Sequence, residues 1–285
     1  MTGRILILGA SGKIGRHSAH AFRAAGWDVR LYDRAKENLM EAAQNCDVII
    51  NGFNPPNYHN WKTIIPKITQ LVIAAARAAN ATVIIPGNVY HFGNQAGILS
   101  EKTLPNPISR KGEIRLAMER EYEASGVQTI ILRAGNFIDP MGQGCPMSLV
   151  YLRSIKSNKI TTPGPVDVRQ AMCFLPDWAR AAVALAQKRH GLDQFEDIPF
   201  AGHTLSAHDV KDSLERVLNR KLKFTQFPWW LFTFTAPFWE LAREMNEMRY
   251  LWNLDHALSD KRLKELLQDF EITPVDDVFR AMFPT

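Results

Sequence analysis

The chain has 285 residues, of which 46% are hydrophobic and 22% are charged, and its net charge is +5. A chain of this length exceeds the usual size of a single domain, so one large domain with a smaller lobe is expected. Lys and Arg are spread along the sequence without a long run, which argues against nucleic acid as a partner. The basic excess either serves an anionic cofactor or substrate or only aids solubility.

The cysteines and the hydropathy of the chain indicate its compartment. Cys46, Cys145 and Cys173 are too few and too widely spaced for a disulfide framework or a metal site. The apolar stretch at 5–8 is too short for a signal peptide, and no segment is long enough to span a membrane. We therefore expect a cytoplasmic protein with neither a bound metal nor an integral membrane segment.

Short apolar runs alternate with helical patterns through most of the chain, which is typical of a parallel sheet covered by helices. Strands are expected at 4–8, 28–32, 47–51, 82–85 and 128–133, and helices at 15–25, 36–45, 64–79, 112–125, 177–188, 260–267 and 276–282. This order predicts an α/β fold with a Rossmann-type doubly wound sheet over residues 1–190. A small substrate-binding C-terminal lobe is expected at 191–285, with contributions from about 140–170.

The clearest motif follows the first predicted strand, where glycines stand at positions 9, 12 and 15. Gly9 permits a tight turn, Gly12 lets the backbone approach a pyrophosphate, and Gly15 lets helix and strand pack closely. The helix that follows presents free N–H groups and its positive dipole end to the phosphates. The predicted pyrophosphate contacts of NAD(H) or NADP(H) are Gly9, Ala10, Ser11, Gly12, Lys13, Ile14 and Gly15.

Asp33 ends the second predicted strand, at the distance from the glycine motif where an acidic side chain binds the adenosine ribose. This favours NAD as the cofactor. Arg34 follows directly and offers a partner for the 2′-phosphate of NADP, which is the alternative. In a third interpretation, Asp33 only caps the helix after the turn.

Aromatic residues are concentrated in the segment 228–239. The segment has three interpretations: the wall of an apolar pocket for a lipophilic substrate, an interfacial membrane contact, or lobe core and the face of a homodimer.

Five segments in order, at 9–15, 47–51, 83–90, 132–137 and 174–179, carry a family resemblance. Over residues 4–185 the chain resembles short-chain dehydrogenases/reductases of the extended or atypical type, which include nucleotide-sugar epimerases. The resemblance implies further cofactor contacts from the ends of the later strands. These are Asn51, Gly52, Phe53, Pro86, Gly87, Asn88, Asn136 and Phe137.

The catalytic positions of that superfamily are changed in this chain. Its Ser falls on Pro86, and its Tyr and Lys, spaced four apart, fall on Lys111 and Arg115. Lys111, Ile114, Arg115 and Glu119 are instead similar to a motif of isoflavone-reductase-like and nitrogen-regulator (NmrA-like) proteins. In the reductases of that group the Lys is the acid/base, which makes Lys111 a candidate catalytic residue and cofactor contact.

A lysine must lose pKa to act as a base near neutrality, and Arg115 one helical turn away supplies a cation that favours this loss. Alternatively, Lys111 is a surface lysine in a charged stretch. Tyr90 follows the fourth strand, where ligands bind in doubly wound sheets, and is the second catalytic candidate; otherwise it packs against the lobe. His91 is a weaker one.

These features predict an NAD(P)-dependent oxidoreductase or epimerase that acts on a small organic substrate, with an apolar one in the pocket interpretation of 228–239. The alternative is a catalytically silent, NmrA-like sensor that binds the dinucleotide and acts on a protein partner.

Overall fold

The computed structural model describes residues 2–142 and 144–283. Its centre is a six-stranded parallel sheet in the order β10-β6-β4-β3-β1-β2. The strands are β1 (Arg4–Leu8), β2 (Asp28–Leu31), β3 (Val48–Asn51), β4 (Thr82–Gly87), β6 (Thr129–Arg133) and β10 (Phe195–Pro199). The strand order reverses between β1 and β3, as in other doubly wound sheets. The predicted Rossmann-type fold is confirmed.

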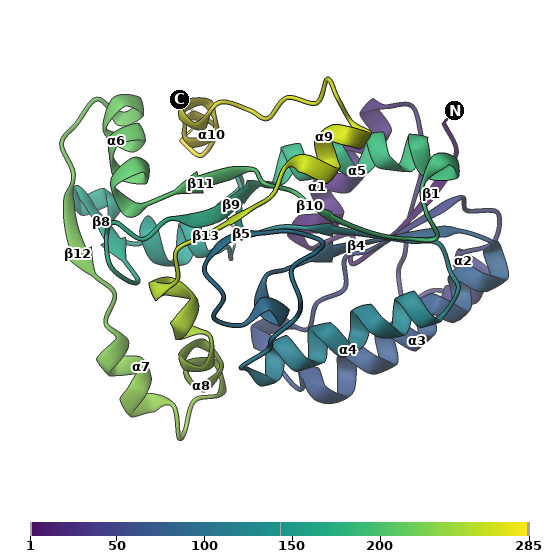
Figure 1. Ribbon diagram of the computed structural model, residues 1–285, viewed down its shortest axis with the longest axis horizontal. Coiled ribbons are helices and arrows are strands. Elements are labelled where there is room, and N and C mark those ends of the chain that lie inside the picture. The colour runs from purple at the N-terminus through teal and green to yellow at the C-terminus, as the bar shows by residue number, and fades with distance from the viewer. Residues whose placement is uncertain (1, 143, 284–285) are drawn as a thin grey trace.

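Helices cover both faces of this sheet, α1 and α5 on one side and α2, α3 and α4 on the other (Figure 1). They span Lys13–Ala24 (α1), Leu39–Ala42 (α2), Trp61–Ala79 (α3), Arg110–Ala124 (α4) and Leu175–Lys188 (α5). Ile5 and Ile7 point to the α1 and α5 face, whereas Leu6 and Leu8 point to the other. Because both faces are buried, the inner strands β1, β3, β4 and β6 are largely continuous apolar runs rather than alternating ones.

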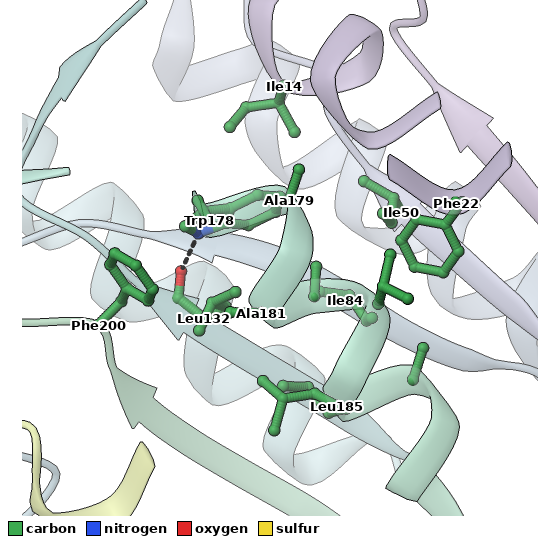
Figure 2. Packing of buried hydrophobic residues seen from close by; sticks show 14 of the residues in the cluster. Ile14, Phe22, Ile50, Ile84, Leu132, Trp178, Ala179, Ala181, Leu185 and Phe200 are labelled. Atoms are coloured by element: carbon green, nitrogen blue, oxygen red, sulfur yellow. Dashed lines mark hydrogen bonds between the residues drawn. The ribbon is translucent and has the colours of Figure 1, made fainter. Parts of the chain in front are cut away.

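The packing of α5 on the sheet is fixed by one polar contact within an apolar interface (Figure 2). The indole N–H of Trp178 donates a hydrogen bond to the carbonyl of Leu132, at 3.0 Å. A fully buried indole needs such a partner, and the strand carbonyl supplies it. Ala179, Ala181 and Leu185 then pack closely on the sheet and on α1.

Smaller sheets extend from the carboxyl end of the main one. They are β11-β9-β7 (His203–Leu205, Gln170–Phe174 and Asn136–Ile138), β12-β8 (Lys223–Gln226 and Lys159–Thr162) and β13-β5 (His256–Leu258 and Gly97–Leu99). The helices of this region are α6 (Ala207–Leu218), α7 (Trp229–Thr235), α8 (Glu240–Glu247), α9 (Lys261–Leu266) and α10 (Val275–Ala281). α6 and α10 enclose a second core with β7 and β9.

The predicted strands and helices of the main domain are present, with ends shifted by one to three residues, except that α2 is much shorter than the predicted helix 36–45. Asn38 accepts a hydrogen bond from the Met40 amide at 2.8 Å and so starts α2 late. Asn45 has a left-handed φ of 60°, which cannot continue a helix. β10 lies beyond the predicted domain boundary at residue 190, so the main sheet takes its last strand from the predicted lobe.

Across the described ranges, none of the helices combines the length and apolar character needed to cross a membrane. Within the same ranges, no His, Cys, Asp or Glu side chains form a group of three or more that suits a metal ion.

Gly15 is where α1 approaches the turn after β1 most closely. A Cβ at Gly15 would lie 2.4 Å from the carbonyl oxygen of Gly9 and 2.6 Å from the Cα of Ala10. Neither backbone atom can move without displacing the helix. We expect Gly15→Ala to lower the free energy of unfolding by about 1–3 kcal/mol, the usual cost of overpacking, as measured by urea denaturation.

Gly191→Ala is the matched control, because a Cβ there would meet nothing within 4 Å. Equal denaturation midpoints for the two variants would show that the close approach at Gly15 is not a constraint.

Candidate functional site

The predicted cofactor residues are brought together at the carboxyl edge of the sheet. Leu8, at the end of β1, is in register with Asn51, at the end of β3, and β3 pairs with β4 on its other side. The loop after β3 packs directly on the loop after β1, since a Cβ on Gly9 would lie 2.8 Å from the Gly52 carbonyl oxygen. Gly9 has a φ of 68°, which a glycine adopts without strain. These contacts shape one continuous edge.

The N-terminus of α1 has the properties of a phosphate site. Gly12 is the N-cap residue and supplies no side chain to cap the helix, and the first turn has no acidic residue. The first N–H groups of a helix have no partner within it and carry partial positive charge. A Cβ at Gly12 would lie 3.1 Å from the Gly9 carbonyl oxygen, which is a tight contact, and would meet no other atom within 4 Å, so the space before the helix is largely open. These features fit a pyrophosphate.

Lys13 and its neighbours connect α1 to the segment after β7. The Lys13 ammonium donates a hydrogen bond to the carbonyl of Gly144, and its burial lowers its pKa. The fully buried carboxylate of Asp139 lies 3.0 Å from His17 Nε2 and 3.3 Å from an Arg16 nitrogen. The charged groups of α1 thus hold this segment beside the glycine turn.

The ribose-binding position is polar and accessible. Asp33 is 44% exposed, and it accepts a hydrogen bond from the Ala35 amide at 3.0 Å and an ion pair from Lys36 at 3.0 Å. The hydrogen bond from Lys36 lowers the pKa of Asp33, so this group is a carboxylate at neutral pH. Arg34 is exposed beside it. Asp33 caps the turn that follows it, whereas Asn38 caps α2.

The side chains of Asn51 and Asn88 form hydrogen bonds that fix the backbone at the ends of β3 and β4. The Asn51 amide donates to the Tyr122 hydroxyl at 3.2 Å and accepts from the Phe53 amide at 3.2 Å. A Cβ at Gly87 would lie 2.6 Å from Ile131 Cγ2, so there is no room for a side chain where β4 packs against β6. The side chain of Asn88 accepts from the Tyr90 amide, at 3.0 Å, and so begins the short helix Tyr90–Phe92.

Asn136 and Phe137 lie on β7, and neighbouring elements hold both side chains. The Asn136 amide donates to the Gln170 side chain at 2.9 Å. Phe137 is partly buried against the α1 and α5 core.

Lys111 is 1% exposed, so it is not a surface lysine. Its ammonium donates hydrogen bonds to the carboxylates of Glu244 and Glu247 on α8, the second at 2.7 Å, and to the Glu244 carbonyl at 3.3 Å. Glu247 also accepts from the backbone amide of Lys111, at 3.2 Å. Burial acts to raise the pKa of Glu247, but its hydrogen bonds and ion pair with Lys111 lower that pKa on balance.

Two tyrosines lie beside this ion pair. The Lys111 ammonium is 5.0 Å from the centre of the Tyr58 ring, and the hydroxyls of Tyr58 and Tyr90 are 3.4 Å apart. Burial raises the pKa of Tyr90 well above its usual value, so its phenol stays protonated. Tyr58 belongs to the short helix Pro56–Tyr58 and has a left-handed φ of 61°. The structure therefore brings both catalytic candidates, Lys111 and Tyr90, to one place around Tyr58.

Arg115 occupies the next turn of α4 on the same side. It is 6% exposed, and its guanidinium donates a hydrogen bond to the Pro86 carbonyl. Its Nε is buried and has no hydrogen-bond partner among the described residues. Burial lowers the pKa of Arg115. An unpartnered buried donor at the end of β4 fits a ligand hydroxyl at this edge.

His91 and Glu119 belong to a separate buried network. Arg133 donates to His91 Nδ1 at 3.0 Å and forms two hydrogen bonds with Glu119, at 3.2 and 2.8 Å. Burial, together with the Arg133 charge, lowers the pKa of His91 to about 4, so the ring is neutral at pH 7. Glu119 thus joins α4 to β6, and His91 joins the short helix Tyr90–Phe92 to the same strand.

The sequence analysis did not single out Glu244, Glu247 or Tyr58. The two glutamates stand three apart on α8, which places both on one helix face. That pattern alone suggests a solvated face, because the sequence gives no sign that a lysine far earlier in the chain packs against it.

The sequence profile of the NAD dependent epimerase/dehydratase family matches residues 5–198. This agrees with the predicted superfamily and with NAD as its cofactor. No curated protein sequence matches the chain.

Solved structures share the fold at low identity. UDP-glucuronic acid 4-epimerase from Bacillus cereus, solved with UDP-glucuronic acid and NAD, has a TM-score of 0.76 at 16% identity, covering 98% of this chain and 97% of its own. RMD from Pseudomonas aeruginosa, complexed with NADPH, has a TM-score of 0.72 at 17% identity, covering 99% and 98%. WbmH from Bordetella bronchiseptica, in complex with NAD+, has a TM-score of 0.71 at 15% identity, covering 99% and 97%.

A substitution at Gly12 tests cofactor binding separately from folding, because few protein atoms lie near this position. Gly12→Val should cost less than about 1 kcal/mol in unfolding free energy, because the N-cap backbone suits a β-branched residue but loses a preferred cap. NADH affinity should fall by at least roughly tenfold, as the side chain fills the phosphate position. Calorimetry with NADH and urea denaturation measure the two effects.

Gly191→Val, remote from the glycine turn in sequence and free of neighbours, should keep both properties. Unchanged NADH affinity in Gly12→Val would show that the loop does not hold the pyrophosphate.

Proposed function

Because the chain belongs to the NAD dependent epimerase/dehydratase family, we propose that it binds NAD(H) along the carboxyl edge of its sheet and catalyses an oxidoreductase or epimerase reaction on a small organic substrate. The observation that carries this proposal is the group formed by the buried Lys111 and the partly buried Tyr58 and Tyr90 at that edge. Protonated groups next to a dinucleotide site are what carbonyl and alcohol chemistry requires.

The binding half of the proposal rests on the glycine turn and on α4. The turn from Gly9 to Gly15 and the N-terminus of α1 would hold the pyrophosphate, and Asp33 the adenosine ribose. Arg115, with its unpartnered Nε, is suited to a hydroxyl of the second ribose. When bound, the nicotinamide supplies the hydride donor or acceptor.

The proton half of the proposal rests on Lys111 and Tyr90. Tyr90 keeps its proton at neutral pH, because burial raises its pKa, and its hydroxyl lies within 3.4 Å of the Tyr58 hydroxyl. The Lys111 ammonium donates hydrogen bonds to two carboxylates and lies between them. Either side chain is suited to give a proton to a substrate oxygen as hydride arrives at the adjacent carbon, and to take it back in the reverse direction.

A second function is favoured by the same ion pairs. Glu244 and Glu247 accept the hydrogen bonds of the Lys111 ammonium, and α8 is also joined to the loop after β3 by a hydrogen bond between Glu240 and His59 at 2.9 Å. If α8 stays in place, Lys111 has no contact with a substrate, and the chain would be a dinucleotide-binding sensor. The sensor would bind NADH without turnover of any substrate, whereas the enzyme would show turnover.

Cofactor choice is tested at Asp33. Its carboxylate would accept hydrogen bonds from ribose hydroxyls and repel a 2′-phosphate, so the wild type should bind NADH more tightly than NADPH. Asp33→Ala should reduce the ratio of the two affinities by roughly tenfold, as expected for one charged hydrogen bond. Lys36→Ala is the control, since it removes the partner of Asp33 and keeps the carboxylate. Tighter binding of NADPH by the wild type would assign the selection to Arg34.

Proton transfer is tested at Lys111. General acid–base catalysis contributes about 100- to 10,000-fold, so Lys111→Met should lose that much turnover while NADH binding falls little. Nicotinamide absorbance would be followed with a panel of carbonyls, alcohols and UDP-sugars, the last because the Bacillus cereus protein binds one.

Lys111→Met also removes the buried partner of Glu244 and Glu247, which then keep only the exposed Arg110 guanidinium, at 3.3 and 3.2 Å, so the variant should lose stability. The variant Lys111→Met/Glu244→Gln/Glu247→Gln removes those charges and should regain the stability but not the turnover. Full turnover in the refolded triple variant would contradict a catalytic Lys111 and would make Tyr90→Phe the next variant to measure.

A further inference from the structure

The helix α7 and the loop after it expose an unusual amount of apolar surface. Phe238 is 94% exposed, Phe234 is 77% and Trp230 is 66%, and Leu231 and Trp239 are exposed as well. We call these five residues the aromatic tip. Figure 1 shows α7 and α8 as two helices at the lower left of the molecule, joined by a loop that forms its lowest point. A contiguous apolar surface of this kind marks an interaction site.

The other face of α7 is firmly attached to the protein, so the aromatic tip is not simply lobe core. The Trp229 indole donates a hydrogen bond to the Pro163 carbonyl at 2.6 Å. Phe227, Trp229 and Phe232 pack their rings against each other and against Met245 and Trp252. The inner aromatic residues of this segment therefore form a small core, and the outer ones are presented on a fixed base.

A basic surface lies along β12, the strand that leads into α7. Arg153, Lys156, Lys159, Lys221 and Lys223 are exposed on and beside β8 and β12, and we call them the basic strip. Lys159 and Lys223 are register partners on neighbouring strands, and β12 leads directly into α7. The Arg153 guanidinium lies 5.2 Å from the Phe227 ring, so the strip reaches the base of the tip.

The segment that carries the aromatic tip has no charged residue. No Asp, Glu, Lys or Arg occurs between Lys223 and Glu240. Of the lysines in the strip, Lys221 is paired with Glu215, at 3.3 Å. Among the described residues, no carboxylate lies within ion-pair distance of Lys156, Lys159 or Lys223. The protein thus exposes an uncharged aromatic projection together with unpaired lysines.

We propose that the aromatic tip and the basic strip dock this protein on the surface of an anionic lipid bilayer. Trp and Phe side chains favour the headgroup region, where their rings leave water. Each lysine near the surface adds attraction to anionic headgroups. A second copy of this chain would explain the exposed rings but not the unpaired lysines, because the copy carries the same cations.

Sedimentation of the full-length protein with vesicles tests this proposal. The wild type should bind vesicles that contain phosphatidylglycerol more tightly than vesicles of phosphatidylcholine alone, and added salt should weaken the binding. Trp230→Ser/Phe234→Ser/Phe238→Ser should weaken binding to the anionic vesicles by about tenfold or more, as expected for apolar surface left in water. Lys159→Glu/Lys223→Glu should weaken it by roughly tenfold or more through lost and reversed charge.

Matched controls use exposed residues elsewhere. Ile98→Ser/Leu104→Ser removes apolar side chains that are 75% and 80% exposed, and Lys67→Glu/Lys261→Glu makes the same change of charge on α3 and α9. Both should bind vesicles as the wild type does. An equal loss in these controls, or no binding of the wild type to anionic vesicles, would overturn the proposal.

The oligomeric state separates the remaining outcome. If the wild type ignores vesicles and light scattering shows a dimer that the triple aromatic variant abolishes, the tip is a dimer face and the proposal is wrong. Vesicle binding is measured without cofactor or substrate, so its failure leaves the proposed enzymatic function untouched.

Discussion

A buried ammonium must be neutralised, and at Lys111 that requirement connects the two halves of the chain. The ammonium of Lys111 is enclosed by the carboxylates of Glu244 and Glu247, which come from α8. Removing both glutamates would leave the Lys111 ammonium buried without a countercharge, which is far costlier than losing a surface ion pair. α8 is therefore held against α4, and the loop that carries Tyr58 is held between them. The position of α8 in turn fixes where α7 projects.

The stripe of charged residues on α4 has three separate attachments. Lys111, Arg115 and Glu119 follow one another at intervals of four, so they share one face of the helix. Their partners are α8 for Lys111, the end of β4 for Arg115, and β6 for Glu119. A helix that buries charges instead of an apolar stripe is stable only when each charge finds its partner. The motif that resembles a catalytic signature thus also determines how α4 is seated.

The local parts of the fold were predictable from sequence because short-range signals determine them. Buried strands such as Val48–Asn51 are continuous apolar runs, and the turn at Gly9 needs a residue that tolerates a positive φ. The short strands beyond β6 were not predicted, since segments of three to five residues carry little periodicity. Glu244 and Glu247 were missed for a different reason. Only the folded chain brings them to Lys111, and nothing in a single sequence marks two residues as partners across such a separation.

The same ion pairs set different requirements for the two functions that the sequence left open. A lysine that serves as acid/base must reach the substrate, yet here the ammonium is satisfied by protein carboxylates before any ligand arrives. In an enzyme, α8 must then move, or the carboxylates must take part in carrying the proton. In a sensor, dinucleotide binding would only need to change the contacts of α4. The buried Nε of Arg115 on this helix has no hydrogen-bond partner among the described residues. Of the three buried charges on α4, only Lys111 forms its ion pairs with the C-terminal lobe. A ligand that altered its hydrogen bonds would therefore change the seating of α8, and with it the surface that α7 presents.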